Sequence, residues 1–167
     1  MDKAAQEAAA HKAAGNVAFT AGRMEEAITC YCAGISMCGE SAECGDTGEL
    51  LSLSLNLAQC FLSTSNWARA AECAEAALVV RSTAKGHFRL ARALHKLGRD
   101  GEAAIHACKA RELSPADPKI RELCNALPAP PAASAGAAGS ACALPPSRLV
   151  GFVASHISSE AGMHTVR

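Results

Sequence analysis

The sequence from Ala84 to Asp117 is AKGHFRLARALHKLGRDGEAAIHACKARELSPAD, and it holds two helical patterns separated by a turn. Small or apolar residues recur every three to four positions on both sides of Gly98, which is the periodicity of amphipathic helices. Ser114-Pro115 ends the second pattern, because proline cannot continue a helix. The stretch therefore predicts a pair of helices that fold back on each other.

The same pattern occurs twice more upstream, so the chain contains an internal repeat. Aligned windows of about 34 residues start at Ala8, Leu51 and Ala84. Three columns of this alignment hold only glycine or alanine, which marks places where helix backbones approach closely and a larger side chain would clash. These columns are Gly15, Ala58 and Ala91; Ala27, Ala70 and Ala103; and Gly34, Ala77 and Ala110.

Each helix pair carries a turn where its two helices should meet. Asn66 is a good N-cap for the helix that follows it, and Asp100 is expected to cap the helix that begins at Gly101. The turns are expected at Ala21-Gly22, Ser65-Asn66 and Gly98-Arg99-Asp100.

The second pair is predicted to have a longer first helix. Asp46 with Glu49 resembles a capping box, which would open a helix that continues through Leu62. After the third pair, an amphipathic segment fits a terminal helix that covers the last apolar face. The predicted fold is therefore all-α, a right-handed superhelix of three helix pairs with a C-terminal capping helix. Its parts are a domain over residues 1–127, repeats at about 8–41, 51–83 and 84–117, and the capping helix over 118–127.

The remaining residues are not expected to join this domain. Residues 128–147 are rich in Pro, Ala, Gly and Ser and carry no charge, which predicts a disordered linker. Residues 148–167 include the apolar run 149–154, which is too short to span a membrane, and we assign this tail no role.

Charge and hydropathy argue against several classes of protein. The chain has 16 Lys and Arg against 16 Asp and Glu, so it lacks the basic excess of a nucleic-acid or anionic-membrane binder. No apolar run reaches the roughly 18 residues of a membrane span, and the start Met1-Asp2-Lys3 does not lead into a signal peptide. We therefore expect a cytoplasmic monomer that binds neither nucleic acid nor membrane.

The nine cysteines do not follow a metal-site pattern. Cys30, Cys32, Cys38 and Cys44 form the one cluster, and their spacing differs from the C-x-x-C pairs of structural zinc sites. Core and surface thiols are therefore favoured over zinc. The sequence also shows no Ser/His/Asp grouping or phosphate-binding loop. We expect no metal, no cofactor and no catalytic residue, and hence no enzyme.

Polar side chains recur on one face of the first helix of each pair. Their spacing of i, i+3, i+4 and i+7 places them on one helical stripe. Lysine supplies a point charge, arginine a bidentate fork and asparagine amide donors, so together they suit carboxylate groups. No acidic residue occupies the matching window positions. The stripe consists of Lys12, Asn16, Asn56, Lys85 and Arg89.

The motifs around these residues resemble a known family. His11–Phe19 looks like the Lys-x-x-Gly-Asn-x-x-Phe opening of tetratricopeptide-repeat (TPR) domains in chaperone cofactors. Leu55–Leu62 is similar to the second-repeat signature of the immunophilins, and Lys85–Arg89 is similar to the start of their third repeat. Residues 4–127 as a whole resemble the TPR domains of the large immunophilins and the Hsp-organising protein.

The resemblance implies a co-chaperone adaptor. In that family, the positions that match the five stripe residues form a two-carboxylate clamp. The clamp holds the last Asp of the Glu-Glu-Val-Asp ending of heat-shock proteins 90 and 70. Apolar residues near Phe19 would take the valine or isoleucine one step back. By this resemblance, Lys12, Asn16 and Asn56 would hold the terminal carboxylate, and Lys85 and Arg89 an acidic side chain.

A generic TPR scaffold that binds another partner is the alternative. Such a scaffold would use its convex face, so substitutions in the clamp would leave its binding intact. No peptidyl-prolyl isomerase domain accompanies the repeats, so the resemblance implies a stand-alone adaptor.

Overall fold

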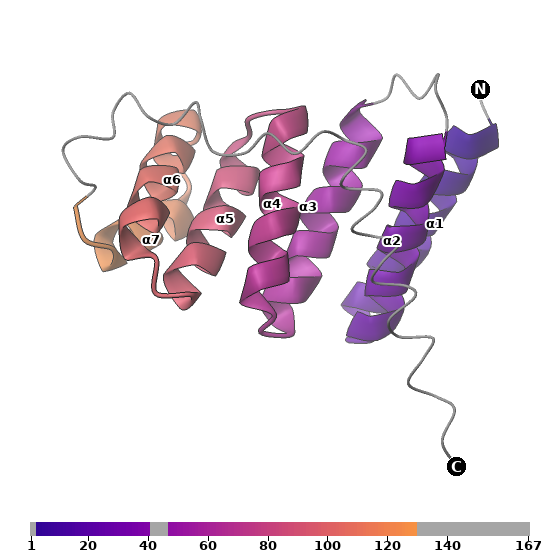
Figure 1. Ribbon diagram of the computed structural model, residues 1–167, viewed down its shortest axis with the longest axis horizontal. Helices are drawn as coiled ribbons and strands as arrows, with labels where there is room; N and C mark the ends of the chain where they lie inside the picture. Colours follow the sequence, from indigo (N-terminus) through magenta and orange to yellow (C-terminus); the bar gives the residue numbers. More distant parts are fainter. Residues whose placement is uncertain (1–2, 41–46, 130–167) are drawn as a thin grey trace, which may run out of the picture.

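Helices account for all the regular structure in the part of the chain that can be described. The computed structural model describes residues 3–40 and 47–129, which form seven α-helices and no strand (Figure 1). The predicted all-α class is thus confirmed. The helices are α1 (Lys3–Thr20), α2 (Met24–Glu40), α3 (Thr47–Ser63), α4 (Trp67–Val80), α5 (Ala84–Lys96), α6 (Asp100–Leu113) and α7 (Pro118–Ala126).

Consecutive helices stand side by side in one row, from α1 at one end to α7 at the other (Figure 1). The closest neighbours are α1 with α2, α3 with α4, and α5 with α6, which are the three predicted helix pairs. Across the pairs, α1 contacts α3 and α3 contacts α5, and the corresponding contacts among α2, α4 and α6 are weaker or absent. The first helices of the pairs therefore lie closer together and line the inner, concave face of the row.

The turn within each pair has the same backbone geometry. The chain passes through a residue with positive φ, which is Gly22 at 76°, Ser65 at 60° and Gly98 at 76°. The next amide then donates to a carbonyl five residues earlier, as in a Schellman turn. These bonds are 2.9 Å long and join Arg23 to Ala18, Asn66 to Phe61 and Arg99 to Leu94.

One of the two predicted N-caps is confirmed and the other is wrong. The Asn66 side chain accepts a hydrogen bond from the Arg69 amide at the start of α4. Asp100 is instead the first residue of α6, and Arg99 takes the N-cap position without a side-chain bond. The cause is the turn through Gly98, which places Arg99 directly before the helix. The Asp100 carboxylate lies 2.6 Å from His95 Nδ1. Asp46 of the predicted capping box lies outside the described residues.

The columns of small residues are points of close packing, as predicted. All seven alanines of these columns have no exposed surface. At Gly15, a Cβ atom would lie 2.6 Å from Cε1 of the Tyr31 ring, so α2 can approach α1 only because this position has no side chain. The alanines are Ala27, Ala58, Ala70, Ala77, Ala91, Ala103 and Ala110.

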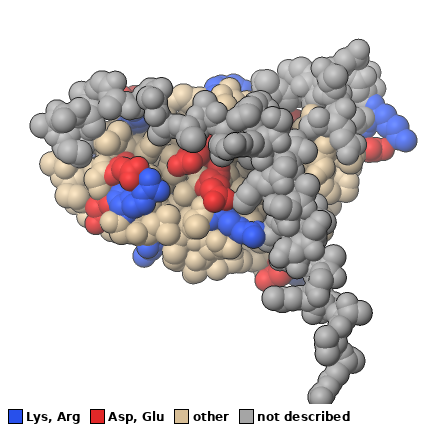
Figure 2. Space-filling view, in the orientation of Figure 1, with Lys and Arg blue, Asp and Glu red and all other residues tan. Residues whose placement is uncertain are grey.

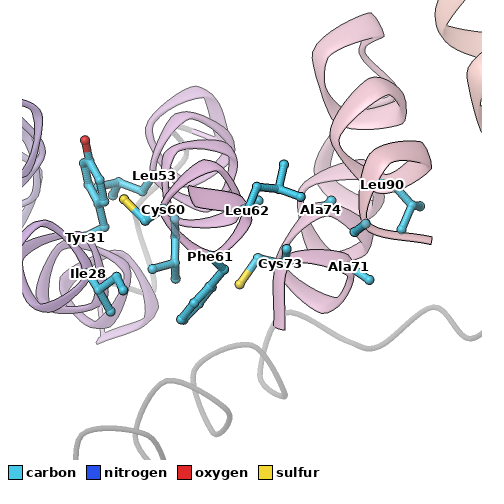
Figure 3. Close-up of a cluster of buried hydrophobic side chains, with 14 of the residues drawn as sticks. Ile28, Tyr31, Leu53, Cys60, Phe61, Leu62, Ala71, Cys73, Ala74 and Leu90 are labelled. Atoms are coloured by element: carbon cyan, nitrogen blue, oxygen red, sulfur yellow. The ribbon is translucent and has the colours of Figure 1, made fainter. Parts of the chain in front are cut away.

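The core runs along the row between the two layers of helices. Figure 3 shows the Tyr31 ring beside Leu53 and Cys60, with Cys73 farther along the same apolar cluster. Cys60 and Cys73 are free, fully buried thiols, and burial raises the pKa of the Cys60 thiol to about 12. They pack as small apolar side chains, in line with the sequence interpretation.

The last helix, α7, covers the end of the row. Asp117 caps it by accepting from the Lys119 amide at 2.9 Å, and Pro118 occupies its first position. Ile120 of α7 and Leu127, which directly follows the helix, are buried. The predicted capping helix is therefore present. None of the helices in the described ranges is long and apolar enough to cross a membrane.

Candidate functional site

All five residues of the predicted clamp lie on the first helices of the pairs. Lys12 and Asn16 are on α1, Asn56 is on α3, and Lys85 and Arg89 are on α5. The two residues on α1 are four positions apart, as are the two on α5, so each couple shares one helix face. Because α1, α3 and α5 lie on the same side of the row, the candidate site, here called the groove, is the face that these three helices share.

The two asparagines are joined directly. Asn56 Nδ2 donates to Asn16 Oδ1 at 3.1 Å, and the Tyr31 hydroxyl donates to the same oxygen at 2.7 Å. Burial is the main cause that raises the pKa of Tyr31 to about 12, so its hydroxyl keeps its proton and remains a donor. Two donors thus hold the Asn16 oxygen, and the Asn16 amide nitrogen is left to donate elsewhere.

Arg89 supplies a partly buried positive charge that acts on Tyr31, the residue whose hydroxyl holds Asn16. Burial is the largest cause that lowers the pKa of the Arg89 guanidinium. Burial also raises the pKa values of Cys60 and Tyr31, and the positive charge of Arg89 partly offsets that rise. An arginine nevertheless stays protonated in a protein. Within residues 3–40 and 47–129, Arg89 makes no hydrogen bond or ion pair, so its five donors are available to a ligand.

Lys85 lies one helical turn before Arg89 and is exposed. The start of α5 is fixed by Thr83, whose hydroxyl accepts from the Gly86 amide at 3.1 Å. Like Arg89, Lys85 forms no ion pair inside the described part of the chain. The α5 side of the groove therefore presents two cations without acidic partners there.

Lys12 differs from these two cations because it is already paired. Its Nζ atom lies 2.6 Å from Glu49 Oε2, and 30% of the Lys12 side chain and 15% of the Glu49 side chain are exposed. Glu49 is in the first turn of α3. The groove therefore contains a carboxylate of the chain itself, next to one of the groups predicted to bind a ligand carboxylate.

The sequence interpretation missed Glu49 as a groove residue. The second repeat window begins at Leu51, so the stripe positions do not include the helical turn before it. The sequence could have indicated Glu49, because the second pair's first helix was predicted to begin upstream of Leu51. Glu49 precedes Asn56 by seven residues, which is two helical turns and therefore the same face.

Phe19, the predicted apolar contact, lies near the end of α1 and is partly exposed. Its ring packs against the buried core cluster. Only part of the ring is therefore available to a ligand. The structure places it on the same helix as Lys12 and Asn16, toward the turn at Gly22.

The face of the molecule seen in Figure 2 is not strongly charged. Figure 2 shows acidic and basic side chains interspersed on the displayed face, among a larger uncharged area. The described residues also contain no group of three or more His, Cys, Asp or Glu that could hold a metal ion. Recognition of a charged ligand therefore depends on local groups such as Lys85 and Arg89.

A row of three helix pairs with closely packed small residues defines a helical-repeat domain, and the comparisons identify its class. Residues 55–118 match the family described as Tetratricopeptide repeat. The described helices as a whole have the fold of TPR superhelical domains. No curated protein sequence matches the chain.

Several solved structures have the same fold. The C-terminal TPR-containing domain of a putative FK506-binding protein from Plasmodium falciparum is 25% identical, with a TM-score of 0.69 over 74% of this chain and 87% of that one. The first TPR of Spaghetti (RPAP3), bound to the HSP90 peptide SRMEEVD, is 24% identical, with a TM-score of 0.65 over 73% and 90%. The Hsp90 co-chaperone Cns1 from Saccharomyces cerevisiae is 21% identical, with a TM-score of 0.68 over 96% and 45%.

Proposed function

We propose that this protein is a TPR adaptor that binds the C-terminal Glu-Glu-Val-Asp tail of heat-shock protein 90, heat-shock protein 70 or both. One observation carries the proposal above the others. Asn16 is held by Asn56 and by the Tyr31 hydroxyl, and the positive charge that acts on Tyr31 comes from Arg89, a partly buried guanidinium that has no acidic partner in the described residues. The similarity in fold to a TPR domain bound to an HSP90 peptide supports it.

The terminal carboxylate of the peptide would bind at the α1 and α3 side of the groove. Asn16 and Asn56 hold each other in place, so their remaining amide hydrogens are oriented before the ligand arrives. A site that is already ordered loses less conformational entropy on binding. Lys12 lies one turn from Asn16 and would add its positive charge.

An acidic side chain of the same peptide would bind at the α5 side. Arg89 is partly shielded from water, where a charge-assisted hydrogen bond to a carboxylate is stronger than on an open surface. Lys85, one turn away and exposed, would contribute a second, more weakly held contact. The exposed part of Phe19 would contact the apolar residue before the terminal Asp.

The affinity of such a site is modest and depends on salt. A short peptide with two carboxylate contacts is expected to bind with a Kd of about 1 μM, equivalent to about −8 kcal/mol. Added salt should weaken the binding, because exposed charges such as Lys85 are screened.

The test is the Lys85→Glu variant, measured by isothermal titration calorimetry with a peptide that ends in Glu-Glu-Val-Asp. We expect binding to be abolished while the helical circular dichroism spectrum is unchanged, because Lys85 is exposed and its replacement repels the ligand. Lys119→Glu makes the same charge change at an exposed position of α7 and should bind like the wild type. Equal binding by the two variants would favour a scaffold that uses another face.

A further inference from the structure

We infer that Glu49 is an internal competitor for the carboxylate site, because it occupies Lys12 until a ligand displaces it. This inference rests on the proposed function and concerns how ligand binding in the same groove is regulated. Glu49 weakens binding of every carboxylate ligand, and it weakens most the ligands that depend on Lys12.

The Lys12–Glu49 pair is a defined contact between two helices. The Nζ–Oε2 distance of 2.6 Å is that of a charge-assisted hydrogen bond. Both side chains are mostly shielded, with 30% and 15% exposed, so solvent and salt screen the pair less than an open surface pair. Since α1 and α3 pack against each other, the two residues are held together in the absence of a ligand.

The pair lies in line with the amide pair of the clamp. Lys12 precedes Asn16 by one turn of α1, and Glu49 precedes Asn56 by two turns of α3, so both contacts cross the same groove. A ligand carboxylate bound to Asn16 and Lys12 would therefore approach the Glu49 carboxylate. Like charges at such short range repel, so the ligand and Glu49 cannot both use Lys12 fully.

The surroundings of Glu49 show that it depends on Lys12. Its second oxygen, Oε1, is buried and has no hydrogen-bond partner within the described residues. A buried carboxylate with one unsatisfied oxygen is held at this place by the charge of its partner. When Lys12 turns to a ligand, Glu49 loses that partner, and this loss reduces the net affinity.

The competition also defines the chemistry of the preferred ligand. With Lys12 neutralised by Glu49, the cations on α5 that have no acidic partner in the described residues include Lys85 and Arg89. A C-terminus with a single carboxylate would have to displace Glu49. A C-terminus with an additional acidic side chain can first bind the α5 cations. The groove should therefore select acidic peptides over peptides that carry a terminal carboxylate alone.

The experiment compares wild type with Glu49→Gln by calorimetry, using a free-acid peptide ending in Glu-Glu-Val-Asp. We expect Glu49→Gln to bind about fivefold to tenfold more tightly, because the charge that holds Lys12 is removed while the side-chain volume is kept. Glu122→Gln, an exposed position on α7, is the matched control and should leave the Kd unchanged. In a Lys12→Ala background the gain should fall below about twofold. A full gain there would contradict displacement from Lys12.

A measurement on the wild-type protein covers the case that Glu49→Gln does not fold. The side-chain carboxyl ¹³C resonance of Glu49 should shift when the peptide is added, because the ligand takes over its partner. A resonance that does not move at saturation would overturn the inference. If wild type binds the peptide through Lys85 and Glu49→Gln binds no more tightly, the inference alone fails. If no variant binds the peptide, the proposed function fails as well.

Discussion

Gly15 is the position where the Tyr31 ring crosses α1, and this contact orients Asn16. Gly15→Ala should destabilise the fold by about 1–2 kcal/mol, because the new Cβ would lie 2.6 Å from Cε1 of a ring that is buried and hydrogen-bonded. Gly101→Ala in α6 meets no atom within 4 Å and should stabilise by up to about 1 kcal/mol, since alanine favours the helix. Urea denaturation of both variants measures the change in the free energy of unfolding. Equal shifts of the same sign would contradict the packing explanation.

Ser65 adopts the left-handed conformation that glycine adopts in the other two turns. Its φ of 60° costs free energy in a residue with a Cβ atom, whereas Gly22 and Gly98 avoid that cost. Ser65→Gly should therefore raise the stability by about 0.5 kcal/mol, after the greater backbone freedom of glycine in the unfolded chain is subtracted. Ser63→Gly, at the last residue of α3, should lower the stability. The midpoint of urea denaturation reports both, and a loss at position 65 would refute the prediction.

Helical periodicity was sufficient to place the clamp candidates on the correct helices. Residues such as Lys85 and Arg89 share a face because they are four apart on one helix, which needs no knowledge of tertiary structure. The Lys12–Glu49 pair was not predictable in this way. Its two residues are 37 positions apart, and their contact depends on how far α3 extends before Leu51 and how α1 packs against it.

At the scale of elements, α5 and α6 meet through two histidines. The Nδ1 atoms of His87 and His106 lie 3.0 Å apart, so one must donate and the other accept, and both cannot be protonated without repulsion. Burial, followed by the charges of His87 and Lys109, lowers the pKa of His106 from 6.5 to about 4. Burial also lowers the pKa of His87. The other charged groups near His106 are Glu102 and Arg99.

This histidine pair predicts a loss of stability in mild acid. Because the folded-state pKa of His106 is depressed, the unfolded chain takes up the proton first as the pH falls. Its contribution is complete above about pH 6.5 and is lost between pH 6.5 and about 4. Between pH 7.5 and 5 the protein should lose about 1–2 kcal/mol through this residue. Urea denaturation at both pH values should show a smaller loss in His106→Gln. An equal loss in the variant would assign the pH dependence to other groups.

The elements were predictable where a single local rule determined them. Asn66 caps α4 because its side chain reaches the amide of Arg69, and this needs only the residues of the turn. The predicted Asp100 cap was wrong because the start of α6 also depends on the turn that precedes it. The positive φ of Gly98 closes a hydrogen bond from Arg99 to Leu94, and that bond sets the first residue of α6. A cap prediction must therefore take into account how the preceding helix ends.

At the scale of the whole molecule, 16 positive and 16 negative residues give no overall charge to attract a ligand. On the proposed function, binding would come from the face of α1, α3 and α5, where the chain supplies both the cations and the Glu49 carboxylate. The superhelix follows from the repeat, because three similar pairs that pack through small residues can only stack in a row. The repeat alignment also predicts which residues share the groove face. Which side chains those residues contact depends on how the helix pairs pack against each other.

The most direct test of the account compares two peptides that differ only in their C-terminal group. A peptide ending in Glu-Glu-Val-Asp is titrated into the protein as the free acid and as the C-terminal amide, and the heat of binding is measured. The account predicts that amidation removes most of the affinity, because the terminal carboxylate would contact Asn16, Asn56 and Lys12. Equal affinity for the two peptides would contradict a carboxylate clamp.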